Sequence, residues 1–395
     1  MIPREGAVGD ATELMLRFAE RTGLTSDRPP QRYLWTDAFA VCNFLGLARA
    51  TGEPRYNELA LRLVDQVHHV LGRHRADDPR TGWISGLGEQ EGALHPTRSG
   101  LRIGKKLSER PPGAPFDESL EWERDGQYFH YLTQWMHALD QVARSTGQAR
   151  FNTWARELAE AAHRSFACGP PVRGGRRMVW KMSIDLSRPL VPSMGQHDPL
   201  DGFITCLQLQ TTASALPGAP REPSLAEAVT EFVILIEGGR WATADPLGIG
   251  GLLTDAYSVA QLMKYGTLRA GDLLDPLLAA ALEGLAHYAR QNDLRQPASQ
   301  RLAFRELGLA IGISAIERIE RETQAMRGRF PGSAGAHGRI EALARYAALG
   351  SGIESFWRDP APWQTRAWVE HRDINDVMLA TCLVPEGLLV IPAAS

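Results

Sequence analysis

Residues 47–57 read LARATGEPRYN, and residues 142–152 read VARSTGQARFN. Each copy follows an apolar stretch with helical periodicity and precedes a second helical stretch. The shared Thr-Gly pair predicts a helix end, because glycine adopts the left-handed conformation that stops a helix without a Cβ penalty. A new helix follows within a few residues, so both copies predict antiparallel helix pairs joined by short turns.

The same periodicity and the signals for helix ends predict about twelve helices along the chain. They cover residues 10–22, 33–50, 54–73, 125–146, 149–167, 199–215, 223–238, 250–265, 274–291, 298–318, 337–349 and 373–383. Strand signals are few, and we expect only small β pieces at Met178–Ile184 and Leu388–Ile391.

The predicted helices are of two kinds that alternate through the first half of the chain. Residues 33–50 and 250–265 are apolar almost all round, as buried helices are, whereas 54–73 and 149–167 are amphipathic. This alternation is expected when inner helices are enclosed by outer helices that face water. The predicted fold is therefore an all-α (α/α)6 toroid of six helix pairs with minor β pieces at the rim. No linker rich in Pro, Gly or Ser divides the sequence, so we expect one domain, 1–395.

Composition excludes several classes of function. The 395 residues are 44% hydrophobic and 23% charged, with a net charge of −3, so nothing favours a nucleic-acid or anionic-membrane partner. No apolar run is long enough to span a membrane, and the first residues lack a signal-peptide pattern. The four cysteines are scattered, which predicts reduced thiols and a cytoplasmic protein. Motifs for nucleotides, serine hydrolases and zinc proteases are absent, and we expect no cofactor and no metal. The sequence leaves the oligomeric state open.

Polar and aromatic residues recur where the predicted inner helices begin. The first such helix carries Trp35-Thr36-Asp37, and the second opens with Asp125-Gly126-Gln127-Tyr128-Phe129-His130. Together with the Thr-Gly turns, these segments resemble the six-hairpin glycosidase-like superfamily, which includes unsaturated glucuronyl hydrolases and N-acylglucosamine 2-epimerases. The resemblance implies a sugar-binding site at the inner-helix N-termini, lined by aromatic residues, with carboxylates or histidines as acid and base.

Two carboxylates are the first candidates for catalysis. Glycosidic hydrolysis needs a protonated carboxyl as general acid and a second carboxylate that activates water or attacks carbon. Asp37 lies between Trp35 and Phe39, an apolar setting that raises a carboxyl pKa and suits the acid. Asp125 lies beside Arg124 and is expected to stay ionised, although Asp125 also has the spacing of a helix N-cap.

Three histidines support a second hypothesis. His130, His197 and His371 each lie near the start of a predicted inner helix, and two of them are able to act as base and acid in a sugar epimerase. Single histidines near helix starts are more often structural, and the spacing does not favour a metal site.

The long connections between helices supply the expected ligand-binding residues. Residues 74–124, 168–197 and 351–372 hold many of the ten tryptophans, whose faces stack well on sugar rings. Within the first connection, Lys105 and Lys106 lie in a basic segment that is able to meet a carboxylate or phosphate of the ligand. The predicted substrate-binding residues are Trp35, Trp83, Arg102, Trp122, Tyr128, Trp180, His197, Asp201, His371 and Arg372.

Three functions remain open at this point. The first is a glycoside hydrolase with Asp37, Asp125 and His130 as catalytic residues and a small carbohydrate as substrate. The second is a histidine-dependent sugar epimerase or isomerase. The third is a non-catalytic ring that binds a glycan or a protein.

Overall fold

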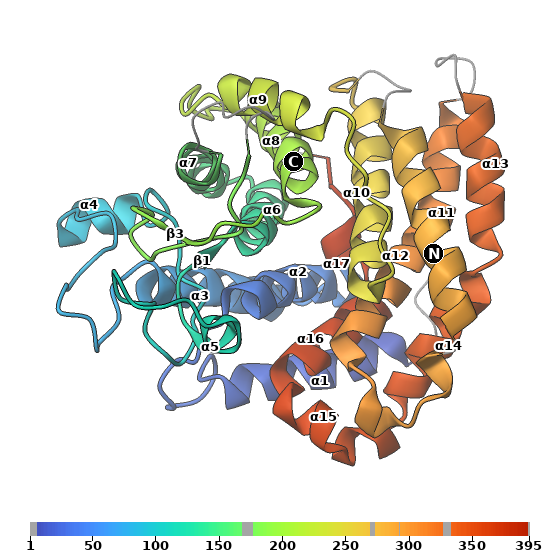
Figure 1. Ribbon diagram of the computed structural model, residues 1–395, viewed down its shortest axis with the longest axis horizontal. Coiled ribbons are helices and arrows are strands. Elements are labelled where there is room, and N and C mark those ends of the chain that lie inside the picture. The colour runs from blue at the N-terminus through green and yellow to red at the C-terminus, as the bar shows by residue number, and fades with distance from the viewer. Residues whose placement is uncertain (1–5, 168–176, 269–272, 292, 327–332, 394–395) are drawn as a thin grey trace. The chain divides into compact units, whose positions relative to one another are not determined.

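The computed structural model describes residues 6–167, 177–268, 273–291, 293–326 and 333–393. Helices dominate these residues, and the all-α class with small β pieces is confirmed (Figure 1). The helices are α1 (Ala7–Arg21), α2 (Leu34–Thr51), α3 (Pro54–Leu71), α4 (Glu89–Leu94), α5 (Glu118–Glu123), α6 (Phe129–Thr146), α7 (Ala149–Phe166), α8 (Asp198–Ala215), α9 (Ala226–Ile236), α10 (Pro246–Lys264), α11 (Leu274–Gln291), α12 (Ala303–Ala325), α13 (Ser333–Ala344), α14 (Ala347–Arg358), α15 (Arg366–Glu370), α16 (Arg372–Leu383) and α17 (Glu386–Leu389).

Most predicted helices are found, and the exceptions have local causes. The helix expected over 125–146 begins only at Phe129, because the preceding residues form strand β1 (Gln127–Tyr128). Residues 388–391, expected as a β piece, end a short helix instead, so that prediction is wrong. The expected connection 351–372 is mostly helical, since α14 and α15 occupy it.

The chain divides into two compact units, each described by itself. Unit 1 comprises Met1–Phe18, Gly46–Glu53 and Arg240–Ile391, and unit 2 comprises Ala19–Leu45, Pro54–Gly239 and Pro392–Ser395. The prediction of a single domain stays a prediction. In unit 1, α10 and α12 pack together at the centre and contact α11, α13, α14 and α16. In unit 2, α6 packs on α7 and α8, and α8 contacts α9.

The repeated sequence phrase ends its helices as expected. Gly52 and Gly147 both adopt left-handed backbone conformations, with φ of 73° and 69°. In unit 2, α6 therefore ends at Thr146. Helix α7 starts two residues after Gly147 and packs against α6. Burial also follows the predicted alternation, because α2 and α10 are buried nearly all round, whereas α3 and α7 bury one face.

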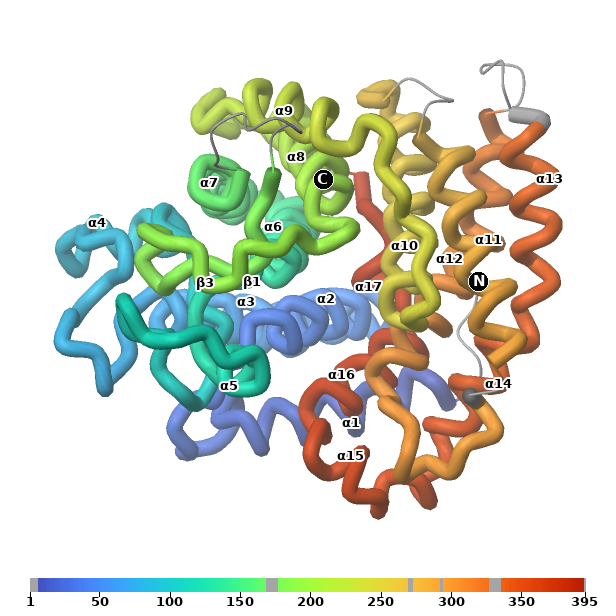
Figure 2. The backbone as a smooth tube through the Cα atoms, in the orientation of Figure 1, coloured from blue at the N-terminus to red at the C-terminus, as the bar shows by residue number. Residues whose placement is uncertain are grey.

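Unit 2 contains a three-stranded antiparallel sheet in the order β1-β2-β3, with β2 at Lys181–Met182 and β3 at Pro189–Val191. The pairing places Tyr128 of β1 opposite Lys181 of β2. The β piece expected near residues 178–184 is thus confirmed. Figure 2 follows the long connection from α3 through α4 and α5 to β1, which delivers the chain to the start of α6.

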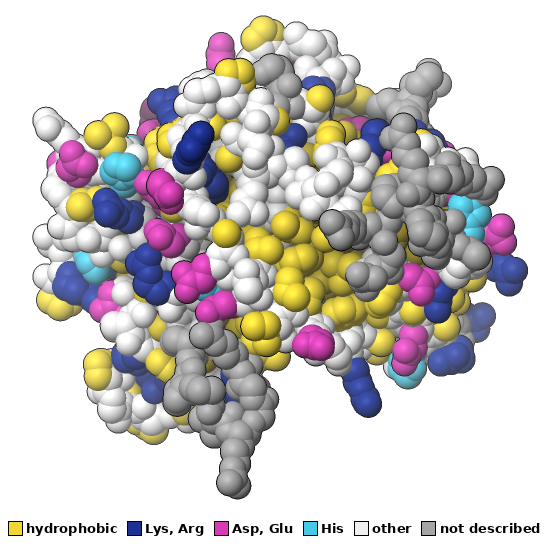
Figure 3. Space-filling view, turned by 90° about the horizontal axis from the view of Figure 1, so that it is seen from above, with side chains coloured by type: hydrophobic (Ala, Val, Ile, Leu, Met, Phe, Trp, Pro, Cys, Tyr) yellow, Lys and Arg dark blue, Asp and Glu magenta, His cyan; other side chains and the backbone are white. Residues whose placement is uncertain are grey.

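Surface and interior agree with a mixed-charge protein. On the described part of the face in Figure 3, Lys and Arg side chains lie beside Asp and Glu rather than in one basic patch. Cys42, Cys206 and Cys382 are buried free thiols, and Cys168 lies outside the described residues. Among the described helices, none has the length and apolar character needed to cross a membrane.

Candidate functional site

Seven aromatic side chains of unit 2 gather around the N-terminus of α6. We call them the aromatic cluster, and its members are Tyr33, Trp35, Trp122, Tyr128, His130, Tyr131 and Trp180. They come from the start of α2, from α5, from β1 and α6, and from the residue before β2. Four of them, Trp35, Trp122, Tyr128 and Trp180, were predicted as substrate-binding residues, and the structure brings these four together.

The β ladder explains the stacking within the cluster. Because β1 pairs with β2, the backbone N–H of Phe129 donates to the carbonyl of Trp180 at 3.4 Å. The Trp180 ring thereby lies nearly parallel to the His130 ring, with centroids 6.1 Å apart and planes 17° apart. Tyr128 stacks on His130 as well, at 5.6 Å. Trp122 packs edge-on against Trp180 and remains 45% exposed.

His130 is a half-exposed histidine with a defined hydrogen bond. The indole N–H of Trp180 donates to His130 Nδ1 at 3.3 Å, which assigns the ring proton to Nε2. Burial among the aromatic rings lowers the pKa of His130 to about 4, so the imidazole is neutral at neutral pH. A neutral imidazole both donates and accepts protons without first losing a charge.

A buried carboxyl faces this imidazole. Asp198 is the first residue of α8, is 4% exposed, and places Oδ1 4.0 Å from His130 Nδ1. Within the described structure its Oδ2 has no hydrogen-bond partner. Burial raises the pKa of Asp198 to about 7, because the charged form is desolvated and no cation of the described residues pairs with it. The His130–Asp198 pair thus combines a neutral base with an acid that titrates near neutrality, a combination typical of proton transfer.

The tyrosines complete the polar side of the aromatic cluster. The hydroxyls of Tyr33 and Tyr131 hydrogen-bond to each other at 2.7 Å. Burial raises the pKa of Tyr33 to about 12 and that of Tyr131 well above its usual value. Both hydroxyls therefore stay protonated at neutral pH and keep their ability to donate and accept hydrogen bonds.

Asp37 is held by contacts at the start of α2. Its carboxylate accepts a hydrogen bond from the backbone N–H of Tyr33 at 2.8 Å, at the start of α2. Arg32, also buried, lies 3.5 Å away as an ion-pair partner. The apolar setting inferred from the neighbours of Asp37 in sequence is thus replaced by a cation and a backbone donor.

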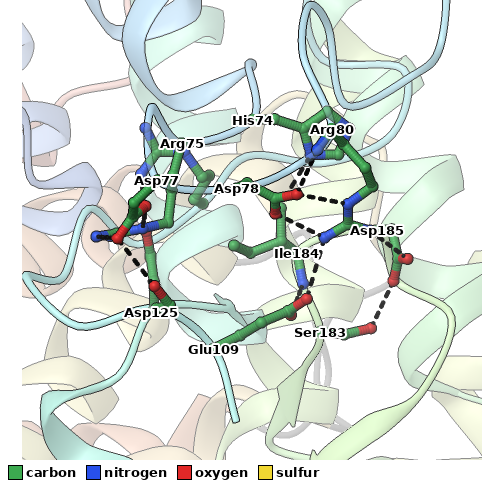
Figure 4. Close-up of polar contacts among 12 residues, drawn as sticks. His74, Arg75, Asp77, Asp78, Arg80, Glu109, Asp125, Ser183, Ile184 and Asp185 are labelled. Atoms are coloured by element: carbon green, nitrogen blue, oxygen red, sulfur yellow. Dashed lines mark hydrogen bonds and ion pairs between the residues drawn. The ribbon is translucent and has the colours of Figure 1, made fainter. Parts of the chain in front are cut away.

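Asp125 lies at the centre of a second ion-paired network, the Arg75–Asp125 network of Figure 4. It accepts from Arg102 at 2.7 Å, from Arg75 at 3.2 Å and from the backbone N–H of Gly104 at 2.9 Å. This network joins the long connection to the start of β1, so Asp125 is not the N-cap of α6. Asp37 and Asp125 are thus each buried in separate ion pairs, and their catalytic assignment stays a prediction.

A neighbouring network ties the two long connections of unit 2 together. Arg80 pairs with Asp78, with Glu109 and with Asp185, the last at 2.7 Å, as Figure 4 shows. Glu109 also accepts from the backbone N–H of Ile184 at 2.6 Å. These contacts hold the loops that carry Trp122 and Trp180 in place.

Other predicted site residues lie elsewhere or bind the protein itself. Trp83 is buried against the guanidinium of Arg73 and has no ring contact with the aromatic cluster among the described contacts. Arg102 is buried and donates to Asp125 and to two backbone carbonyls. His197 and Asp201 flank Asp198 at the start of α8 and are half-buried. His371 and Arg372 belong to unit 1, so their place in the same site stays a prediction.

Sequence reasoning passed over Asp198, Tyr33 and Tyr131. Asp198 precedes a proline at a helix start, which capping explains sufficiently, and no sequence signal shows that its carboxyl lacks a cation. Across the described residues, no group of three or more His, Cys, Asp or Glu side chains is arranged to hold a metal ion.

Comparisons with known proteins give likenesses in structure but none in sequence. No protein-family model matches the chain, and no curated protein matches it. The chain is similar to the crystal structure of a sugar epimerase from a ruminal bacterium, with a TM-score of 0.48 and 8% sequence identity. The match covers 95% of this chain and 98% of that one.

Proposed function

We propose that unit 2 binds a small carbohydrate on the aromatic cluster and that the His130–Asp198 pair moves a proton on the bound sugar. The reaction class is aldose–ketose isomerisation or epimerisation of a free sugar. One observation carries the proposal: a neutral, half-exposed imidazole lies 4.0 Å from a buried carboxyl whose pKa is near 7, within an aromatic surface.

The aromatic cluster supports sugar binding. Sugar rings present apolar C–H faces that stack on aromatic rings, and their hydroxyls need polar partners at the edge of the stack. Trp122 and Trp180 supply ring faces, and the bonded Tyr33 and Tyr131 hydroxyls supply polar groups.

The pair supports proton transfer in two forms. When Asp198 is ionised, its charge favours the tautomer with the ring proton of His130 on Nδ1. This tautomer requires the Trp180 indole to release its hydrogen bond to Nδ1, and it leaves the Nε2 lone pair as a base. This base takes the proton from the carbon next to the sugar carbonyl. Loss of this proton leaves an enediolate, in which the proton of the neighbouring hydroxyl passes to the former carbonyl oxygen. The pair, which now holds the abstracted proton, returns it to the former carbonyl carbon. The 4.0 Å separation shortens by about 1 Å to form the bond, as catalytic contacts commonly tighten on substrate binding.

One acid–base pair suffices to move a proton between neighbouring carbons of an open-chain sugar. Inversion at a single carbon needs a second acid–base group on the opposite face of the sugar. His197, one residue before Asp198, is our candidate for that group and distinguishes an epimerase from an isomerase.

Glycoside hydrolysis is the second candidate, because a carboxyl with a pKa near 7 also suits a general acid. It ranks lower, since hydrolysis needs a second carboxyl group across the bond. Asp37 and Asp125, which the sequence favours for these roles, are each held by arginine.

The test is a substrate screen in D2O followed by proton NMR. Free aldoses and ketoses are compared with ordinary and unsaturated glycosides. Isomerase or epimerase activity exchanges the hydrogen next to the carbonyl for deuterium, and hydrolysis does not. We expect His130→Gln to lower kcat by roughly 10²–10⁴-fold. The matched control is His163→Gln, because His163 also faces a carboxylate, Glu231 at 2.8 Å, but lies on α7. Equal loss in both variants, or none in either, refutes the assignment.

A further inference from the structure

Lys105 lies at the edge of the aromatic cluster, and its ammonium forms no hydrogen bond or ion pair with the described residues. Its Nζ lies 5.5 Å from the centroid of the Tyr33 ring, and the side chain is half-buried. Among the described residues, no carboxylate or carbonyl forms a hydrogen bond or ion pair with this ammonium. Glu123 and Asp125 act on it only at longer range. Burial lowers the pKa of Lys105, which shows that its surroundings do not replace the lost water.

Two neighbouring buried cations, Lys181 and Arg102, are engaged by acceptors of the protein. Lys181 lies 5.3 Å from the Tyr128 ring but donates to the carboxylate and the carbonyl of Glu121 and to the carbonyl of Arg124. Arg102 is likewise engaged by Asp125 and by two carbonyls. Lys105 therefore differs from its neighbours in having donors that remain for a ligand.

The backbone holds Lys105 in this position. Its carbonyl accepts from Arg75 at 2.6 Å, and the N–H of the preceding residue, Gly104, donates to Asp125 at 2.9 Å. Figure 4 shows Arg75 fixed between Asp77 and Asp125. Gly104 has a φ of 94°, and a Cβ there would lie 2.2 Å from the carbonyl oxygen of the residue before Tyr33. The Arg75–Asp125 network thus sets Lys105 against the start of α2.

We propose that Lys105 binds an anionic group of the sugar substrate, a carboxylate or a phosphate ester, at the Tyr33 edge of the aromatic cluster. This inference rests on the proposed function and narrows its substrate to acidic sugars. An anion at this position supplies the acceptor that the half-buried ammonium lacks, and hydrogen bonds between charged partners are the stronger kind. A neutral sugar provides no anionic acceptor for the ammonium, so the cost of its desolvation is not offset.

The experiment compares three probes that share the glucose ring and differ in the group at C6: D-glucuronate, D-glucose 6-phosphate and D-glucose. Binding is measured by calorimetry and turnover by NMR, for the wild type, Lys105→Gln, Lys105→Arg and Lys106→Gln. Lys106 is the matched control, because it is the adjacent lysine and is exposed. We expect Lys105→Gln to lower affinity for the anionic sugars by roughly 10- to 100-fold relative to glucose. Lys105→Arg restores part of it, and Lys106→Gln has little effect.

The outcomes separate this inference from the proposed function. A preference for glucuronate identifies a carboxylate ligand, and a preference for glucose 6-phosphate identifies a phosphate. If glucose is bound and converted as well as the anions, and Lys105→Gln changes nothing, the inference fails while the proposed function stands. If none of the three is bound, and the wider screen of sugars gives no turnover, both fail.

Discussion

Replacing Asp198 with asparagine separates the cost of the buried charge from the shape of the side chain. Asparagine keeps the size of aspartate and its acceptor oxygen but does not ionise. In the wild type, ionisation places a charge at a site that is 4% exposed and that no cation in the described part of the chain pairs with. We therefore compare the free energy of unfolding of Asp198→Asn with that of the wild type at each pH. We expect this difference to shift in favour of Asp198→Asn as the pH rises from acidic to alkaline.

The size of this effect follows from the pKa. Asp198 has a pKa of about 7 when folded against an ordinary value of 3.8. Because the folded-state value is raised, the stabilisation is present at low pH and is lost as pH rises through 7. The total is about 4 kcal/mol, of which about 3 kcal/mol is lost between pH 5 and pH 8. The N-terminus of α8 favours the anion by only about 0.3–1 kcal/mol, so burial dominates.

The assay is urea unfolding of both proteins at pH 5 and pH 8, followed by circular dichroism. Any pH-independent cost of the unpaired amide cancels when the two pH values are compared. Glu227→Gln serves as control, because Glu227 is an exposed carboxylate in the first turn of α9. If wild type and Asp198→Asn lose stability in parallel over this range, Asp198 has an ordinary pKa and the proposed acid–base pair loses its acid.

Three further predictions test other parts of unit 2. Trp122→Ala removes an exposed ring that packs on Trp180, and we expect KM for the sugar to rise roughly 2- to 15-fold with little change in stability, by steady-state kinetics. Asp125→Asn leaves two arginines without their buried carboxylate and should cost about 3–5 kcal/mol in urea unfolding, whereas replacing the half-exposed Asp77 should cost under about 1 kcal/mol. His68 is buried, and desolvation lowers its pKa to about 3, so the unfolded chain binds the proton more tightly. Stability should thus fall as pH drops from about 6.5 toward 3, and His68→Gln should weaken that acid sensitivity in thermal melts.

The helices were predictable because their signals are local. Apolar periodicity and the Thr-Gly turns depend only on residues within one or two helical turns, so α2, α3, α6 and α7 emerge with small errors at their ends. The failures are also local in origin. A short apolar run such as 388–391 satisfies strand and helix patterns equally, and tertiary packing decided for helix.

Only part of the candidate site was predictable from the sequence. The aromatic residues are recognised by residue type and local position, whereas the role of a carboxylate depends on contacts with residues far away in the sequence. Trp122, Tyr128 and Trp180 stand out by residue type and by their position near an expected helix start. The role of a carboxylate depends on which cation reaches it, and Arg102 reaches Asp125 across 23 positions of sequence. The spacing of residues in the sequence does not predict this ion pair.

Burial without a cation is therefore the feature that separates Asp198 from the two carboxylates favoured by sequence. Asp37 and Asp125 are as deeply buried as Asp198, yet arginines compensate both of them, and they hold the start of α2 and the Lys105 segment in place. Asp198 has the Gly195 backbone and a neutral imidazole beside it instead. This difference is the observation on which the proposed proton transfer at the start of α8 depends.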